Sequence, residues 1–202
     1  MRRVLFFFVF TALFTVPVFG MPLIQQEDTW DYCVLDFNLH YILKSIEYAD
    51  FDWDNADWIE GQAAFGSGRE PAGGTINTDW KVGTDLALRK SFQLESLPTE
   101  NLRLDLAVDN GCVIFINGEE VTERIAESFT SLWEYTTEID PKYLKLGTNT
   151  VSVLTEDHGG VTYFDMKLEV VPEPATICLL GLGAVLMLRK RHRRVQVRKI
   201  QT

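Results

Sequence analysis

The stretch that decides the fold is residues 102–121, which read LRLDLAVDNGCVIFINGEEV. Every second residue of 102–108 is apolar, and this period of two predicts a strand with one buried face. Residues 109–111 (Asp-Asn-Gly) predict a turn, and the apolar run at 112–116 predicts a second strand. Asn117-Gly118 then offers the positive φ angles of a tight hairpin, so the chain is expected to reverse direction there.

Outside this stretch the sequence keeps the same pattern of short apolar segments. Apolar residues at 86–94, 151–153 and 164–170 predict further strands. Residues 35–41 also alternate, but the apolar spacing 35, 39, 42 and 46 fits a helix, so this element stays open between strand and helix. Turn signals about every ten residues and the lack of a long helical period predict an all-β body, an antiparallel β-sandwich.

Charge divides the chain into an acidic middle and basic ends. The sequence has 19 Lys and Arg residues against 29 Asp and Glu residues, a formal net charge of −10. Residues 1–20 and 189–202 hold two and seven of the basic residues and no acid. Residues 21–188 therefore hold ten basic residues and all 29 acids, a formal charge of −19. Because such a body repels phosphate backbones, we expect no nucleic-acid partner.

Residues 1–20 have the three parts of a secretory signal peptide. Two arginines precede an apolar run at 4–16, and Val18 and Gly20 occupy the −3 and −1 positions of a cleavage site. A run of 13 apolar residues is short for a bilayer core, which favours a signal peptide over an N-terminal anchor. We therefore expect export of a β-sandwich ectodomain at 21–170.

A second apolar segment lies near the C-terminus. Residues 175–188 have no polar face, and as a helix they would be roughly 21 Å long, against about 30 Å for a bilayer core. Basic residues follow at once, which is the cytoplasmic stop pattern. The sequence predicts one transmembrane helix at 175–188, in contact with membrane lipid, with the basic tail 195–202 inside; an amphipathic or buried terminal helix is the alternative. The basic cluster at the membrane stop is Arg189, Lys190, Arg191, Arg193 and Arg194.

Pro172-Glu173-Pro174, the short apolar segment and the arginine-rich end, in this order, resemble the PEP-CTERM sorting signal of exported proteins in Gram-negative bacteria. The resemblance covers residues 171–194. It implies that a membrane transpeptidase-like exosortase recognises the motif and removes the tail, so Pro172, Glu173 and Pro174 are a substrate sequence for another enzyme. It also implies a protein anchored at least transiently in the inner membrane. The destination would then be the periplasmic face, the cell surface or the extracellular matrix.

A second resemblance covers residues 51–170. Residues 109–121 look like the DDGxxVYLNGxEV hairpin of galactose-binding-like jelly-roll domains, residues 53–68 are similar to their FDDSxWxxGxAPxGYG stretch, and residues 144–151 resemble LKPGxNxI. Residues 164–168 resemble the closing strand. The resemblance implies a jelly-roll sandwich. Such domains accompany glycosidase and phosphoesterase catalytic domains and occur alone as carbohydrate-binding modules, so it also implies carbohydrate binding.

Two residues are candidates for contact with a ligand. Trp80 lies between Asp79 and Lys81 in a polar loop, where an exposed indole can stack on a sugar ring. His158 stands beside Asp157 and two glycines in a loop expected to be exposed. Core packing is the alternative for each aromatic residue.

The segment 50–58 is crowded with acids. Asp50, Asp52 and Asp54 place hard oxygen ligands at alternate positions, so Ca²⁺ is the candidate metal. The segment is not an EF-hand, because Asn55 and Gly61 stand where that loop needs Gly and Glu. A solvated acidic turn is the alternative. No cofactor is required by the sequence.

Cys33 and Cys112 would face an oxidising compartment after export. A bridge between them would close a long loop and contribute roughly 4 kcal/mol by the chain-entropy model. Cys112 equally fits a plain core position in a strand. No nucleophile elbow and no His or Cys spacing typical of a metal site occurs, so the chain is not expected to be an enzyme.

The sequence therefore predicts an exported cell-surface or matrix-associated protein, sorted by an exosortase-type system, with a module that binds extracellular polysaccharide or another partner. One alternative is a small glycan hydrolase acting through acids at 50–60 or near His158. The other is a purely structural matrix component.

Overall fold

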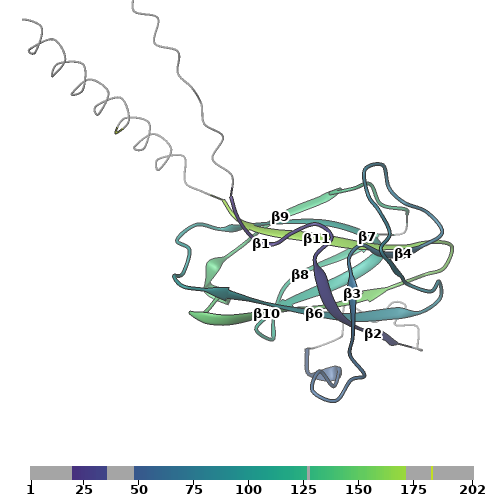
Figure 1. The fold of residues 1–202 in the computed structure, drawn as a ribbon, viewed down its shortest axis with the longest axis horizontal. Coiled ribbons are helices and arrows are strands. Elements are labelled where there is room, and N and C mark those ends of the chain that lie inside the picture. Colours follow the sequence, from purple (N-terminus) through teal and green to yellow (C-terminus); the bar gives the residue numbers. More distant parts are fainter. Residues whose placement is uncertain (1–19, 36–47, 127, 172–182, 184–202) are drawn as a thin grey trace, which may run out of the picture. The chain divides into compact units, whose positions relative to one another are not determined.

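The computed structural model describes residues 20–35, 48–126, 128–171 and 183, and its central element is the long strand β7 (Leu102–Ile116) (Figure 1). The turn predicted at 109–111 is wrong, because the strand continues through it. Residues 102–109 pair with β11 (Thr162–Val170), whereas residues 110–116 pair with β8 (Glu119–Ala126). The polar residues that suggested a turn thus mark the point where β7 changes partners.

β7 joins two groups of strands, which we call sheet A and sheet B. The described body is built of paired strands, so the all-β prediction is confirmed. Every pairing among these strands is antiparallel except that of β4 with β5. Sheet A contains the first half of β7 with β1 (Met21–Ile24), β4 (Phe65–Ser67), β5 (Thr78–Asp79), β9 (Tyr135–Ile139) and β11. Sheet B contains the second half of β7 with β2 (Thr29–Leu35), β3 (Ile59–Gln62), β6 (Asp85–Leu94), β8 and β10 (Gly147–Glu156). Two short 3₁₀ helices, η2 (Tyr48–Asp50) and η3 (Pro141–Tyr143), lie between strands.

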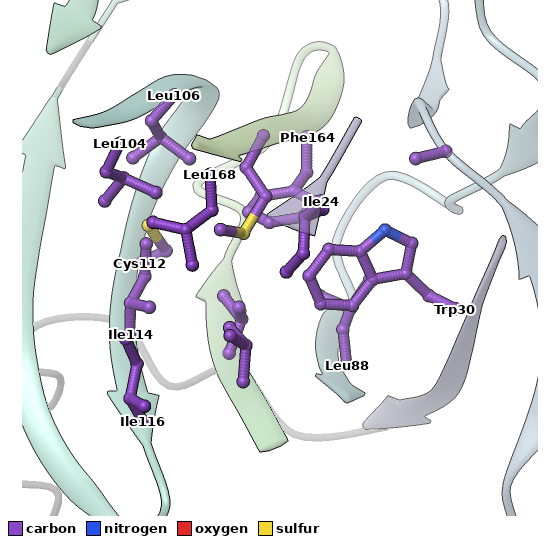
Figure 2. Close-up of a cluster of buried hydrophobic side chains, with 14 of the residues drawn as sticks. Ile24, Trp30, Leu88, Leu104, Leu106, Cys112, Ile114, Ile116, Phe164 and Leu168 are labelled. Carbon is purple, nitrogen blue, oxygen red and sulfur yellow. The ribbon is translucent and has the colours of Figure 1, made fainter. Parts of the chain in front are cut away.

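One hydrophobic core takes alternate residues from both sheets (Figure 2). Leu104 and Leu106 enter it from sheet A, and Cys112 and Ile114 enter it from sheet B. The indole of Trp30 is 1% exposed and packs edge-on against Phe164, with ring centroids 6.2 Å apart. Burial of this apolar surface, worth about 25 cal/mol per Å², is the main stabilising term of the body.

The hairpin predicted at Asn117-Gly118 is confirmed, with φ angles of 54° and 89° between β7 and β8. The Asn117 amide donates to Asn149 Oδ1 at 2.9 Å. Asn149 is fully buried, and its own amide donates to the carbonyls of Lys145 and Gly147. The hairpin at 109–121 and the segment 144–151, far apart in the sequence, therefore meet through two asparagines.

Several predicted features lie outside the described residues. They are the signal peptide, the motif Pro172-Glu173-Pro174, the apolar segment 175–188 apart from Gly183, the basic cluster and residues 36–47. Within the part of the chain that the structure describes, no helix is both long and apolar enough to cross a bilayer.

The possible Cys33–Cys112 disulfide is not formed, because both thiols are free, and Cys112 takes the alternative core position. Cys33 pairs with Ala87, Ala87 with Leu154, and Leu154 with Val113, so three strand spacings, about 14 Å, separate Cys33 from β7. A disulfide needs Cα atoms within about 7 Å. The side chains also occupy opposite faces of sheet B, since Cys112 enters the main core and Cys33 does not.

A thiol reagent is therefore expected to label Cys33 in the folded protein and Cys112 only after unfolding. Cys33 is partly exposed, whereas burial raises the pKa of the Cys112 thiol far above its usual range. The measurement is intact mass of the chain carrying Cys178→Ser: one added label in buffer and two in denaturant. If neither thiol is labelled in denaturant until a reductant is added, Cys33 and Cys112 are joined by a disulfide after all.

Candidate functional site

Trp80 does not form the exposed platform that its polar neighbours suggested. Its side chain is 0% exposed and belongs to the main core. The indole Nε1 donates to the Thr84 carbonyl at 2.8 Å, and Thr162 Oγ1 donates to the Trp80 carbonyl at 2.6 Å. The prediction that Trp80 is exposed is wrong, because the turn at 81–84 folds back onto the ring.

His158 is also directed inward, although the loop around it is exposed at Gly159 and Gly160. Its side chain is only 12% exposed, and Nε2 lies 3.4 Å from Glu156 Oε1. The backbone N–H of His158 donates to Asn110 Oδ1 at 2.7 Å. The backbone of His158 thus fastens this loop to the middle of β7, its imidazole lies beside Glu156 of β10, and the exposure expected for it is wrong.

Buried carboxylates surround the same loop. Asp157 accepts hydrogen bonds from the N–H groups of Gly83 and Gly159, and its own N–H donates to Asp85 Oδ1 at 3.0 Å. Asp109 is 3% exposed, and burial together with the charge of Asp157 raises the pKa of its carboxyl to about 6. We call Asp85, Asp109, Asn110, Glu156, Asp157 and His158 the polar network; it ties the turn before β6, the centre of β7 and the loop after β10 together.

The acidic segment 50–57 does not form the predicted calcium site. Among the described residues, no group of three or more His, Cys, Asp or Glu side chains is arranged to hold a metal ion. The Asp52 carboxylate instead accepts from the backbone and side-chain N–H groups of Asn55 at 3.0–3.1 Å, and these bonds lower the pKa of Asp52. The Asp50, Asp52 and Asp54 assignment is therefore replaced by an acidic turn closed by Asn55.

Aromatic side chains gather on the outer face of sheet B. We call Phe51, Trp53 and Trp58, with Arg89 and Asp31, the aromatic patch. Trp53 and Trp58 stack with centroids 5.8 Å apart and an interplanar angle of 14°, and Phe51 meets both edge-on. Beneath them lies a second apolar cluster from alternate positions of four strands: Leu35, Ala87, Val113, Phe115 and Leu154. Aromatic side chains, and not only charged ones, therefore cover part of the outer face of sheet B.

Arg89 completes the patch with three kinds of contact. Its guanidinium lies 4.2 Å from the ring centroid of Trp58, its Nε donates to Asp31 Oδ2 at 3.1 Å, and its Nη1 donates to the Trp53 carbonyl at 3.1 Å. The Arg89 and Asp31 side chains remain 34% and 47% exposed. A guanidinium donor, a carboxylate acceptor and a partly exposed indole thus stand together at the surface.

Sequence reasoning missed Arg89 and Asp31. They are 58 residues apart, and they meet because β2 pairs with β6 in the register Asp31↔Arg89. The charge pattern gave one usable signal: each is a charged residue within a strand, on the face opposite its core neighbours. That signal predicts that both side chains point away from the core, but it does not predict that they contact each other.

The two ends of the body meet at one place in sheet A. β1 pairs with the end of β11 in the register Met21↔Val170, Pro22↔Glu169 and Ile24↔Leu168. Val171, which is 42% exposed, follows, and Pro172 comes next in the sequence. The start of the described body therefore lies beside the residue from which the chain enters the Pro-Glu-Pro motif.

Comparison with known families identifies this C-terminal region. The family described as PEP-CTERM protein-sorting motif matches residues 170–194. The resemblance drawn from the sequence at 171–194 is thus confirmed. The motif indicates export and sorting to the cell envelope or surface, with an exosortase-type enzyme as the processing partner.

Solved structures resemble the fold only distantly. A β-glucuronidase from an uncultured Clostridium sp. is 14% identical with a TM-score of 0.48, over 80% of this chain and 31% of that chain. An apo β-glucuronidase from Ruminococcus gnavus is 13% identical with a TM-score of 0.48, over 80% and 31%. An anti-sigma factor domain-containing protein from Clostridium clariflavum is 12% identical with a TM-score of 0.42, over 70% and 42%. This chain spans under half the length of each, and no curated protein matches its sequence.

Proposed function

We propose that the chain is an exported protein of the cell surface or extracellular matrix, which an exosortase-type enzyme processes at Pro172-Glu173-Pro174, and whose β domain binds carbohydrate through the aromatic patch. The observation that carries the sorting part is the family match at 170–194, which begins at the last residue of β11. The binding part rests on the aromatic patch and on the resemblance to galactose-binding-like domains.

The chemistry of the aromatic patch suits a saccharide. The Trp58 indole is partly exposed, with Trp53 stacked on it and the Arg89 guanidinium over its ring, and its remaining apolar surface can pack against a sugar ring. Arg89 can donate to hydroxyl oxygens, and Asp31 can accept from hydroxyl groups. Stacking on Trp53 and the edge-on contact with Phe51 hold the indole in place before binding, which lowers the entropic cost of association.

The charge of the body narrows the class of glycan. Residues 21–188 carry a formal charge of −19, and an acidic surface repels polyanions. We therefore propose a neutral glycan as the ligand and not a uronic-acid polymer.

A hydrolytic role draws no support from the polar network. Asp109 and Asp157, whose charges interact, are only 3% and 0% exposed, and the Asp157 carboxylate accepts hydrogen bonds from backbone N–H groups. We propose that these acids fix the loop after β10. A binding function without catalysis is the simpler account of the domain.

Trp58→Ala is expected to weaken binding of neutral glycans at least tenfold while the domain stays folded. Its matched control is Trp133→Ala. Trp133 is also partly exposed and also has a cation on its ring, Lys167 at 4.1 Å, but it lies with sheet A. The measurement is affinity on a glycan panel with thermal unfolding of each variant. If the wild type binds no glycan, the carbohydrate proposal fails and a structural matrix role takes its place. If both variants lose the same glycan affinity, the aromatic patch is not the binding site.

Replacing Pro172, Glu173 and Pro174 together by alanine is expected to abolish sorting. The precursor should keep its C-terminal tail and remain in the cell-envelope fraction, whereas the wild type is shortened. The same triple-alanine replacement at the exposed segment 95–97 is the control. Shortening of the motif variant at the wild-type rate would contradict recognition of this motif.

A further inference from the structure

The sorting motif starts almost where the folded body ends. Val170 is the last residue of β11 and is paired on both sides, with Met21 of β1 and with Leu102 of β7. Only Val171 separates it from Pro172. The chain thus has a spacer of one residue between a paired strand and the motif.

Residues 168–170 are closed to any further strand. β7 occupies one edge of this part of β11 through the pairs at 102–104, and β1 occupies the other edge. One recurrent mode of peptide recognition adds the peptide as an extended strand, through the same backbone N–H and C=O groups that sheet pairing uses. While both edges are paired, an enzyme that binds in this way cannot pair with residues 168–170.

β1 is the weaker of the two neighbours, yet it is anchored. It has four residues, and its register with β11 shifts between Pro22 and Ile24. Ile24 is 1% exposed in the main core, and Leu168 opposite it is also 1% exposed. At its start, a Cβ on Gly20 would lie 2.7 Å from the Val170 carbonyl oxygen, so the two chain segments are in close contact.

We propose that β1 acts as a clasp on the sorting reaction: while it is paired with β11, it keeps residues 168–170 from the sorting enzyme, and processing is fastest when β1 has separated from β11. This inference rests on the proposed processing at Pro172-Glu173-Pro174. It makes the rate of sorting depend on the first strand of the domain, which is 148 residues upstream of the motif if counted from Ile24 to Pro172. Local opening of a short terminal strand costs less than global unfolding, so the clasp can open in the folded protein.

The test is the rate at which the full-length precursor is shortened in its native host, followed by pulse-chase. Insertion of Gly-Ser-Gly-Ser between Val171 and Pro172 lengthens the segment between β11 and the motif without opening β1. We expect this variant to be processed at least threefold faster than the wild type. The same insertion between Gly159 and Gly160 is the control, because both glycines are exposed with open space around them. Equal rates for wild type, spacer variant and control would overturn the clasp.

A second pair of variants tests β1 itself. Ile24→Ala removes the anchor of the clasp, and Ile116→Ala removes an equally buried isoleucine of the same core in sheet B. We expect faster processing for Ile24→Ala than for Ile116→Ala at similar loss of stability. Equal acceleration would mean that processing follows global unfolding, and the clasp fails. If no variant is shortened at all, including the wild type, the proposed processing fails instead.

Discussion

Asn149→Ala is expected to lower the free energy of unfolding by about 3–5 kcal/mol, one of the largest losses available to a single polar substitution. The side chain is fully buried and takes part in four hydrogen bonds, with the Lys145 N–H, the Lys145 and Gly147 carbonyls and the Asn117 amide. Alanine would remove all four bonds and leave an unfilled space at a buried position, where the half-buried Asn117 amide loses one of its two acceptors. The measurement is urea unfolding followed by intrinsic fluorescence.

The matched control is Asn55→Ala. Asn55 makes three hydrogen bonds with the carboxylate oxygens of Asp52, but it is exposed, so water replaces its partners. We expect a loss of about 1 kcal/mol or less for this variant. A loss below about 1 kcal/mol for Asn149→Ala as well would contradict the view that this asparagine joins the hairpin at 117 to the turn at 145–147.

Asp165→Asn is expected to remove most of the fall in stability that the wild type shows between about pH 4 and pH 7. Asp165 is 0% exposed; its Oδ1 accepts from the Met166 N–H at 2.9 Å, and its Oδ2 is buried with no hydrogen-bond partner. Burial raises the pKa of this carboxyl to about 7, the Met166 and Glu27 N–H groups oppose the rise, and the charge of Glu27 adds to it. The Tyr163 hydroxyl, also buried and unpartnered, lies on the same face of β11.

The direction follows from proton binding. Because the pKa is raised in the folded state, the folded protein holds the proton where the unfolded chain, with a value of 3.8, has lost it. The stabilisation is therefore complete below about pH 4 and is lost as the pH rises to about 7. A shift of this size corresponds to at most about 4 kcal/mol, since one unit is worth about 1.4 kcal/mol.

Asp109→Asn serves as the comparison for this titration. Its carboxyl has a pKa raised to about 6 by burial and by Asp157, so it accounts for a smaller fall that ends near pH 6. Unfolding in urea at pH 4.5 to 8 measures both variants against the wild type. If Asp165→Asn leaves the fall between pH 6 and 7 unchanged, a different group is responsible for it.

Local patterns predicted the elements whose signals lie within one stretch of chain. The hairpin at 117–118, the strand at 86–94 and the closing strand at 164–170 all appear, because alternation and turn residues specify them without help from distant segments. The same local reasoning failed at 109–111. Asp109 and Asn110 favour a turn in isolation. Pairing of Asp109 with Tyr163 and of Asn110 with Ala126, and a hydrogen bond to Asn110 from a loop 48 residues away, keep them in a strand.

The candidate site was harder to predict, because exposure is a property of the whole fold. Polar neighbours suggested that Trp80 is exposed, yet the neighbours face water while the ring enters the core. The separation of Cys33 from Cys112 could not be predicted for a related reason. Strands β6 and β10 lie between them, and strand order depends on long-range pairing. The sorting motif could be predicted, because its whole signal lies in one continuous stretch of sequence.

The most direct test of the account is the mass of the mature protein recovered from fractionated native host cells. The account predicts a chain that starts at Met21, ends within residues 171–174 and lies outside the inner membrane. A chain that keeps its residues through Thr202 and stays in the inner membrane would contradict it, because the motif at 170–194 would then be no sorting signal and the acidic β domain would act from a permanent anchor.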